Sequence, residues 1–214
     1  MGLKVNEIFF SIQGESTYSG IPCAFVRLAG CNLRCTYCDT TYAYDQGSVM
    51  EVAEVIRQAT GFHCPWVALT GGEPLLQEDT PNLLVSLLNL NKMVIVETNG
   101  SLDIDRIDRR CVRVVDVKCP GSGQCRHNDP QNLHRLTAND QVKFVISDRG
   151  DYDFAKSVIK GLGARVPSEQ LLLSPAHGVL APDLLARWIL NDRLHVRLNL
   201  QLHKIIWPND TRGV

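Results

Sequence analysis

Three closely spaced cysteines are the strongest chemical feature of the sequence. Cys31, Cys35 and Cys38 form a C-x3-C-x2-C pattern. Thiolates packed this closely in a connecting loop can bind a soft metal centre. A structural zinc site or a fully ligated iron–sulfur cluster normally needs four protein ligands, so this set would leave one metal ion open to an exogenous ligand. An open position is typical of a reactive site.

Two simpler interpretations of the cysteine pattern stay open at this point. On a helix, positions i, i+4 and i+7 share one face, and the cysteines would be core residues. Gly30, Asn32, Thr36 and Asp39 lie among them and favour a loop instead. A zinc ribbon would need a second cysteine pair, and the remaining cysteines contain no C-x2-C.

The remaining cysteines are expected to be bystanders. They are Cys23, Cys64, Cys111, Cys119 and Cys125. Cys23 lies in an apolar run and is expected in the core. Cys119 and Cys125 bracket a glycine-rich segment, where an auxiliary cluster would need more ligands. We expect no export signal and a sizeable core, so reduced thiols in a cytoplasmic protein are favoured over disulfides.

A second motif directly follows a predicted strand. Thr70–Pro74 reads Thr-Gly-Gly-Glu-Pro, after a strand expected at 66–70. Glycines let a backbone approach a ligand closely, and a carboxylate can pair with an ammonium group. Alone the motif would be only a turn. Glu97–Gly100 repeats the theme of polar groups followed by a glycine at the end of the next strand.

The composition is ordinary for a globular protein. The chain has 214 residues, of which 44% are hydrophobic and 21% charged, and this predicts one domain over residues 1–214. The net charge of −1 gives no basic field that would favour nucleic acid as a direct partner. Polar residues interrupt the apolar run Leu83–Val96, so we expect no membrane span there.

The order of predicted elements favours an α/β fold. Strands are expected at about 5–12, 22–29, 66–70, 93–98, 112–117, 141–147, 170–173 and 195–200. Helices are expected after a capping box at Ser48–Glu51, after an N-cap at Thr80, and near 151–162 and 181–190. A full eight-fold barrel needs about 250 residues, so the sequence predicts an incomplete (β/α) barrel with a mostly parallel sheet. Polar strand ends would then meet at one ligand-binding face.

The cysteine triplet and the Gly-Gly-Glu motif together resemble the radical S-adenosylmethionine (SAM) superfamily. Tyr37, an aromatic residue directly before the last cysteine, adds to the resemblance. It implies a [4Fe–4S] cluster on the three cysteines, with SAM bound to the open iron. It further implies that the reduced cluster cleaves SAM, and that the resulting 5′-deoxyadenosyl radical abstracts a hydrogen atom from a substrate.

Further segments resemble one family in that superfamily, the 7-carboxy-7-deazaguanine synthases. They are Ile8–Ser16, Phe25–Cys31, Asp39–Thr40, Gln201–His203 and Arg212–Val214, so the resemblance spans essentially the whole chain. It implies conversion of 6-carboxy-5,6,7,8-tetrahydropterin to 7-carboxy-7-deazaguanine with loss of ammonia, on a route to queuosine and other 7-deazaguanines. It also implies a homodimer, assistance by Mg²⁺, and SAM that is regenerated in each turnover.

The resemblance assigns the substrate contacts residue by residue. They are Ile12, Gln13, Gly14, Glu15, Arg27 and Thr70, together with a tail residue that is either Pro208 or Val214. Glu15 and Arg27 are the expected catalytic residues. A guanidinium suits planar, bidentate recognition of a carboxylate. Outside this motif Arg27 would be read as a surface arginine.

The resemblance also assigns the cofactor contacts. Those to SAM are Tyr37, Cys38, Asp39, Gly72, Glu73, Asp116, Val117, Lys118, Ser174, Pro175, Ala176 and His177. Lys118 keeps the lysine of the family's usual Ser-Pro-Lys, whereas the two residues before it depart from that pattern. Thr40 is the expected Mg²⁺ ligand, because a hydroxyl beside an acidic residue suits a hard cation that keeps several waters. Asp39–Thr40 could also cap a helix.

The expected partners are a small pterin, a reductant such as flavodoxin or ferredoxin, and a second copy of the chain, with neither nucleic acid nor membrane.

Two alternative functions stay open. A small radical SAM activase, which forms a glycyl radical on a partner protein, shares the C-x3-C-x2-C spacing. A non-catalytic zinc-binding module would hold zinc rather than iron and sulfide, so metal analysis separates it from both enzymes.

Overall fold

One nine-stranded sheet organises the chain in this computed structural model, which describes residues 2–207, 212 and 213. The strand order is β3-β1-β2-β4-β5-β6-β7-β8-β9. The strands are β1 (Gly2–Ile12), β2 (Pro22–Leu28), β3 (Ser48–Glu51), β4 (Trp66–Gly71), β5 (Met93–Thr98), β6 (Val112–Asp116), β7 (Gln141–Ile146), β8 (Leu171–Pro175) and β9 (Arg197–Leu198). The helices are α1 (Val52–Gly61), α2 (Thr80–Asn89), α3 (Asn132–Arg135), α4 (Arg149–Leu162), α5 (Pro182–Asn191) and α6 (Leu202–Ile206).

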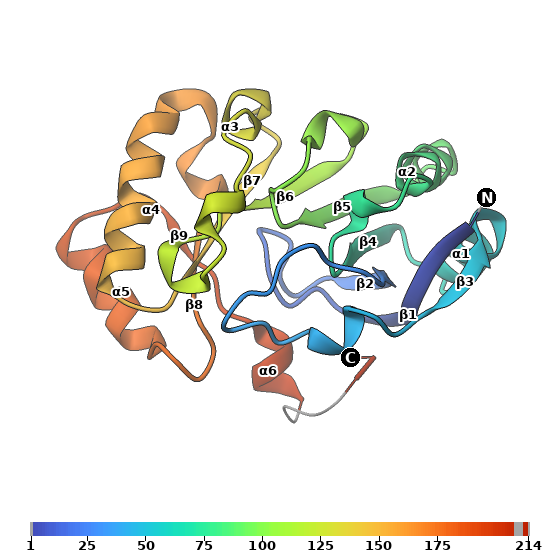
Figure 1. Cartoon of the computed structure of the whole chain (residues 1–214), viewed down its shortest axis with the longest axis horizontal. Helices are drawn as coiled ribbons and strands as arrows, with labels where there is room; N and C mark the ends of the chain where they lie inside the picture. The colour runs from blue at the N-terminus through green and yellow to red at the C-terminus, as the bar shows by residue number, and fades with distance from the viewer. Residues whose placement is uncertain (1, 208–211, 214) are drawn as a thin grey trace.

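Most of the sheet is parallel and it does not close on itself. From β2 through β9 every neighbouring pair is parallel, whereas β1 pairs antiparallel with both β2 and β3. β3 and β9 stand at opposite edges of the strand order (Figure 1). The expectation of an incomplete barrel with a mostly parallel sheet is therefore confirmed.

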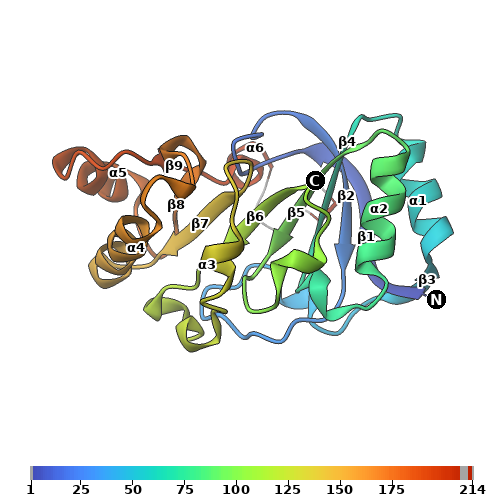
Figure 2. The same cartoon turned by 90° about the horizontal axis from the view of Figure 1, so that it is seen from above.

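Alternation along the strands sends side chains to two apolar clusters. Helices α1, α2, α4 and α5 lie on the outside of the sheet (Figure 2), where their buried residues pack against outward-facing strand residues such as Val26, Leu69 and Val96. The inner face carries a smaller cluster made of Phe9, Cys23, Phe25, Ala68, Ile95, Val114 and Leu172. Because successive strand residues point to opposite faces, each strand serves both clusters.

The local capping signal at Ser48–Glu51 is wrong as a helix start. These residues form β3 and pair with β1, with Gly2 opposite Glu51 and Val5 opposite Ser48. Ladder hydrogen bonds to a distant strand override the local preference, and α1 begins only at Val52. The strand expected at 195–200 is shorter, since only Arg197–Leu198 pairs with β8.

The other predicted helices form close to the expected positions. α2 begins at Thr80, with Asp79 rather than Thr80 at the N-cap, and the Thr80 hydroxyl bonds to the carbonyl of Pro74 instead (2.6 Å). In α4 the Asp148 side chain accepts a hydrogen bond from the amide of Asp151, so that this helix starts with a side-chain cap. The predicted ends of α4 and α5 differ from the observed ends by one or two residues, which is the usual uncertainty of helix boundaries.

A buried ion pair ties β6 to the segment before β7. Arg113 and Asp140 are each only 1% exposed. Two nitrogens of the guanidinium meet both carboxylate oxygens, at 2.8 Å from Nε and 2.6 Å from Nη2. The amide and hydroxyl of Thr137 complete the coordination of the carboxylate. Every charge in this pair is therefore matched and hydrogen-bonded.

We expect Asp140→Ala to lower the free energy of unfolding by about 3–5 kcal/mol, because the buried Arg113 charge loses its two-point partner and keeps only the more exposed Asp105, at 3.6 Å. Urea denaturation followed by circular dichroism measures the loss. The matched control is Asp183→Ala, which removes an exposed i,i+4 pair with Arg187 and should cost far less. Equal losses in the two variants would contradict the role given to the buried pair.

Candidate active site

One cavity collects nearly all of the predicted site residues. It lies on the inner face of the sheet, and it is lined by strands β1, β2 and β4 through β8, by residues 29–40 between β2 and the next helical turn (the cysteine loop), and by α6. The predicted residues that line it are Ile12, Gln13, Gly14, Glu15, Arg27, Cys31, Cys35, Tyr37, Cys38, Asp39, Thr40, Thr70, Gly72, Asp116, Lys118, Ser174, Pro175, Ala176 and His177. Parallel strands bring their carboxyl ends to one edge, which is why distant motifs meet here.

Two predicted SAM contacts do not line the cavity. Val117 packs in the cluster between the sheet and the helices. Glu73 is fully buried, and its carboxylate accepts hydrogen bonds from the Thr98 hydroxyl and from the amides of Leu75 and Asn99. In this geometry the carboxylate links the segment after β4 to the end of β5, and burial raises its pKa. Its contact with SAM stays a prediction. Pro208 and Val214 lie outside the described residues.

The two glycines after β4 let the cysteine loop pass close to that strand. The amide of Gly72 donates to the carbonyl of Leu28, and that of Glu73 donates to the carbonyl of Gly30 (2.7 Å). A Cβ on Gly72 would stand 2.1 Å from the carbonyl oxygen of Gly30. Only glycine permits this approach, so the Gly-Gly pair holds the backbone of the cysteine loop in place.

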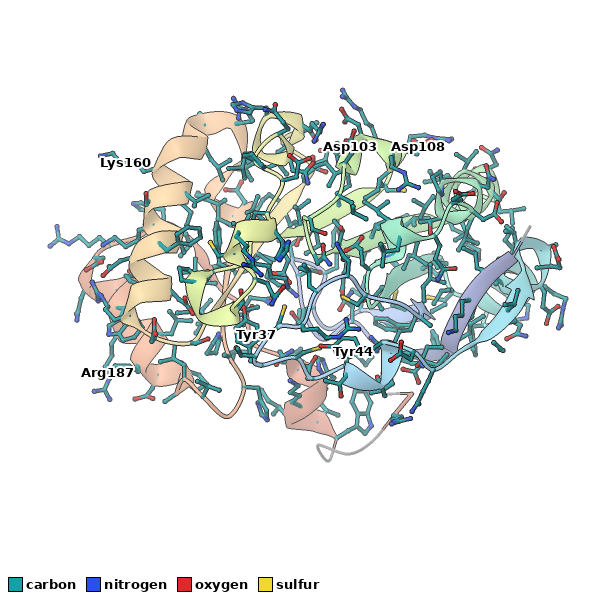
Figure 3. The ribbon with its side chains drawn as sticks, in the orientation of Figure 1. Tyr37, Tyr44, Asp103, Asp108, Lys160 and Arg187 are labelled. Carbon is teal, nitrogen blue, oxygen red and sulfur yellow. The ribbon has the colours of Figure 1, made fainter. Side chains whose placement is uncertain are left out.

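The three cysteines of the motif lie in a loop of turns and bends, so the helical-stripe interpretation is wrong. All three line the cavity and are partly exposed. Sγ of Cys31 accepts a hydrogen bond from the amide of Leu33 (3.5 Å) and faces Nδ2 of Asn99 (3.9 Å). Burial raises the pKa of Cys35, although Lys118 opposes that shift. Figure 3 labels Tyr37, within this loop, and Tyr44, shortly after it, in the lower middle of the view.

The remaining cysteines are free thiols, and none of them lines the cavity. Cys23 and Cys119 are completely buried, and Cys64 and Cys111 nearly so. Burial raises the pKa values of Cys23 and Cys111 to about 12, which keeps both as inert thiols at neutral pH. The expectation that Cys23 is a core residue is confirmed.

The donor set of the cavity fits a [4Fe–4S] cluster with a polar ligand beside it. In such a cluster each cysteine binds a different iron, so the thiolates need not converge on one point. No group of three or more Cys, His, Asp or Glu side chains within residues 2–207, 212 and 213 is arranged around a single metal position. Oη of Tyr37 and Oδ1 of Asp116 are buried in the cavity wall without a hydrogen-bond partner among the described residues. Buried polar atoms are normally satisfied, so both atoms are available to a bound ligand.

A row of polar side chains crosses the inner face above the apolar cluster. Arg27 lies opposite Thr70, and Asp116 lies opposite Lys143, in the strand register. The Thr70 hydroxyl donates to Oε2 of Glu97 (3.0 Å). Residues at matching positions of adjacent parallel strands point the same way, so these side chains form one continuous wall of the cavity.

Opposite charges are paired in that wall. Lys143 meets Glu15 at 3.1 Å and Lys118 meets Asp116 at 2.6 Å. Burial alone would raise the pKa values of Glu15 and Asp116, but the neighbouring lysines and the hydrogen bonds to each carboxylate together outweigh it, and both pKa values are lowered. Both carboxyl groups are therefore ionised at neutral pH.

Helix α6 closes the open side of the sheet. The amide of Leu202 donates to the carbonyl of Gly14 (2.9 Å), and Gln201 bonds to Glu15 (2.8 Å). Lys204 forms an ion pair with Asp39 in the cysteine loop. Burial would raise the pKa of Asp39, yet Lys204 and the hydrogen bonds around the carboxylate hold it below its usual value. α6 therefore links the β1–β2 hairpin to the cysteine loop.

Several cavity residues escaped the sequence analysis. They are Lys143 and Lys204; Glu97 and Asn99 at a strand end, and Gln201 and His203 in the tail, were noticed but given no role. Alternation along 141–147 could have placed Lys143 on the inner face. The α6 residues carry no comparable signal, because their position depends on how the tail folds back across the sheet.

Comparisons with known proteins agree with this geometry. The Radical SAM superfamily profile matches residues 26–116. The 7-carboxy-7-deazaguanine synthase of Chlorobaculum tepidum is 47% identical over 99% of this chain and 97% of its own length. That of Koribacter versatilis is 42% identical over 99% of this chain and 100% of its own. The crystal structure of QueE from Escherichia coli has the same fold, with a TM-score of 0.77 at 21% identity over 94% of each chain.

The open parallel sheet and the three-cysteine loop at its edge, together with the profile match, define a radical SAM enzyme. Membership of that superfamily implies a [4Fe–4S] cluster and SAM as cofactors. The chain belongs to the 7-carboxy-7-deazaguanine synthase family. None of the helices in the described part of the chain is long and apolar enough to span a membrane.

We expect Gly14→Ala to displace α6, because a Cβ there would stand 2.2 Å from Nδ1 of His203 and 3.1 Å from its backbone nitrogen. Hydrogen exchange of the 201–207 segment should become at least about fivefold faster, since the Leu202-to-Gly14 bond is strained or lost. The matched control is Gly61→Ala at the end of α1, where an added Cβ meets nothing within 4 Å. Unchanged exchange in Gly14→Ala would contradict the packing described for α6.

Proposed function

We propose that this enzyme converts 6-carboxy-5,6,7,8-tetrahydropterin to 7-carboxy-7-deazaguanine and ammonia. The relatives at 47% and 42% identity carry that product in their names. The reaction balances as the loss of one ammonia from the tetrahydropterin. SAM would be regenerated in each turnover. The proposal does not rest on the names alone, because the cavity has features that suit this substrate.

The free terminal nitrogens of Arg27 in the cavity are the observation that supports the proposal most strongly. Its side chain lines the cavity, on the strand that leads directly into the cysteine loop. Nε of Arg27 bonds to Glu7, whereas neither terminal nitrogen has a hydrogen-bond partner among the described residues. A guanidinium edge with two free donors matches a carboxylate bidentately. A 6-carboxylate held there would place the pterin ring close to the cysteines.

Gln13, Thr70 and Glu97 would hold the pyrimidine edge of the pterin. Oε1 of Glu97 accepts from the Gln13 amide (3.2 Å), and its other oxygen accepts from the Thr70 hydroxyl (3.0 Å). A carboxylate oxygen has further lone pairs, which can accept from the amino and ring N–H groups of a 2-aminopyrimidinone. Glu15, held ionised by Lys143, adds a further acceptor in the same cavity.

The cofactors would occupy the cysteine-loop side of the cavity. Cys31, Cys35 and Cys38 would hold the cluster, and Gly72, Tyr37 and the 174–177 segment would contact SAM. When bound and reduced, the cluster and SAM together supply the radical that removes a substrate hydrogen. The protein's own residues position the reactants and exclude water, as is usual for cofactor enzymes.

Mg²⁺ would be held at Thr40. The Thr40 hydroxyl lines the cavity and donates to Oδ1 of Asp39 (3.0 Å), so hard oxygen donors lie together there. Mg²⁺ usually takes only one or two protein ligands and keeps several waters. We further propose a homodimer, a flavodoxin-like or ferredoxin-like reductant, and a cytoplasmic location, in line with the family resemblance.

The test is incubation of the cluster-loaded, reduced enzyme with 6-carboxytetrahydropterin, SAM and Mg²⁺. Formation of 7-carboxy-7-deazaguanine with an equal amount of ammonia, and no net loss of SAM, is the expected result. Stoichiometric consumption of SAM with a radical on a partner protein would instead favour the activase. Absence of product from enzyme with an intact cluster would overturn the proposal.

We expect Arg27→Lys to lower kcat/KM for 6-carboxytetrahydropterin by about 30-fold or more, because a lysine cannot replace two parallel hydrogen bonds to a carboxylate. Iron content and SAM binding should match the wild type, since Arg27 contacts neither the cysteines nor the Gly72 region in the described structure. A kcat/KM within about twofold of the wild type would show that the carboxylate is bound elsewhere.

A further inference from the structure

An irregularity in β1 changes which of its side chains face the cavity. In the β1–β2 ladder Val5 lies opposite Leu28 and Glu7 lies opposite Arg27, so Asn6 is an extra residue in the strand. Before Asn6 the odd-numbered residues Leu3 and Val5 face the helix-side core. After it, Phe9 faces the inner cluster. A one-residue bulge reverses the face of all later residues.

The bulge brings Glu7 directly against Arg27. Oε1 of Glu7 accepts from Nε of Arg27 at 2.7 Å, and the two side chains are only 19% and 16% exposed. In a regular ladder continued from the Val5–Leu28 pair, Asn6 would lie opposite Arg27 and Glu7 would point to the other face. The side chain of Asn6 instead bonds outward, to the carbonyl of Gln46 (2.7 Å). Bulges beside active sites commonly re-aim a side chain in this way.

Two aromatic rings also lie close to the guanidinium of Arg27. The guanidinium carbon lies 5.7 Å from the Phe9 ring centre and 5.8 Å from that of Tyr42. The hydroxyl of Tyr42 donates to the same oxygen of Glu7 (3.2 Å). On the C-terminal tail, Arg212 lies 4.2 Å from the Tyr42 ring centre. The orientation of Arg27 is thus fixed by groups from β1 and from the turn after the cysteine loop, and the tail packs on that turn through Arg212.

We propose that Glu7 is a positioning residue for substrate recognition: it holds Nε of Arg27 so that both terminal nitrogens stay directed at the substrate carboxylate. This inference rests on the proposed function and deepens it. Nε and one terminal nitrogen form one binding edge of a guanidinium, and the two terminal nitrogens form another. By occupying Nε, Glu7 leaves the terminal edge for the ligand.

Other carboxylates in the cavity could draw Arg27 away from the substrate-binding position. Glu15, Asp39, Glu97 and Asp116 all line the same cavity as Arg27. Each could attract a mobile guanidinium and so cover the carboxylate site. Glu7 fixes Arg27 at the β1 side, and Tyr42 fixes Glu7 in turn. The wall then presents a preformed donor pair, which lowers the ordering cost of binding.

The test compares Glu7→Gln with the wild type as cluster-loaded enzyme with SAM and Mg²⁺. We expect KM for 6-carboxytetrahydropterin to rise about tenfold, as for loss of other supporting residues behind a ligand-binding group, with kcat changed by no more than about twofold. Inhibition by tetrahydropterin without the carboxylate should be unchanged. An unchanged KM overturns the proposal. So does an equal weakening of both ligands, which would indicate a general loosening of the cavity.

A double-mutant cycle shows whether Glu7 acts through Arg27. In an Arg27→Lys background we expect Glu7→Gln to change KM by less than about twofold, because its target is already gone. A full tenfold effect in that background would overturn the proposal. Tyr42→Phe removes only the hydroxyl that supports Glu7, and we expect a rise in KM of about two- to fivefold. An unchanged KM would contradict the role of Tyr42 in fixing Glu7.

The matched control is Glu54→Gln, which breaks an exposed Glu–Arg pair on α1 and should leave KM unchanged. Urea denaturation of each variant shows that the compared proteins are folded. If the wild-type enzyme forms no 7-carboxy-7-deazaguanine, the proposed function fails. If the wild type turns over and Glu7→Gln is indistinguishable from it, only the positioning role fails.

Discussion

The site depends on one constraint, which is that charges taken out of water must have partners. Three ion pairs meet that constraint around the cavity: Glu7 with Arg27, Glu15 with Lys143, and Asp116 with Lys118. A fourth pair, between the exposed Asp39 and Lys204, links the cysteine loop to α6 at the mouth of the cavity. Together they join β1, the cysteine loop, the carboxyl end of the sheet and α6. The pairing that allows the charges to be buried is therefore also what assembles the cavity.

What remains unpaired defines what the cavity can bind. The terminal nitrogens of Arg27, Oη of Tyr37 and Oδ1 of Asp116 have no partner among the described residues. Beside them lie the three thiols of the cysteine loop. An anionic group for the guanidinium, polar groups for the buried oxygens and iron for the thiols would satisfy all of them. The proposed carboxylated pterin, together with SAM and an iron–sulfur cluster, would supply that set.

Local sequence patterns predicted much of the fold and of the site, whereas the features they missed depend on pairing between distant segments. The cysteine loop, the Gly-Gly turn and most strand positions follow from spacing and alternation within short segments. β3 did not, because a capping signal at Ser48–Glu51 yields to pairing with β1. The bulge at Asn6 and the position of Lys204 depend on partners far along the chain. Glu73 shows a further limit of local patterns. Its motif does not reveal that the carboxylate accepts hydrogen bonds from Thr98 and Asn99, at the end of β5.

The most direct test of the account is a crystal structure of the cluster-loaded enzyme with SAM and 6-carboxytetrahydropterin. The account predicts the substrate carboxylate on the two terminal nitrogens of Arg27, with Glu7 still on Nε and the pyrimidine edge against Gln13 and Glu97. A carboxylate bound instead to Lys143, or a pterin bound outside the cavity between α6 and the cysteine loop, would contradict it.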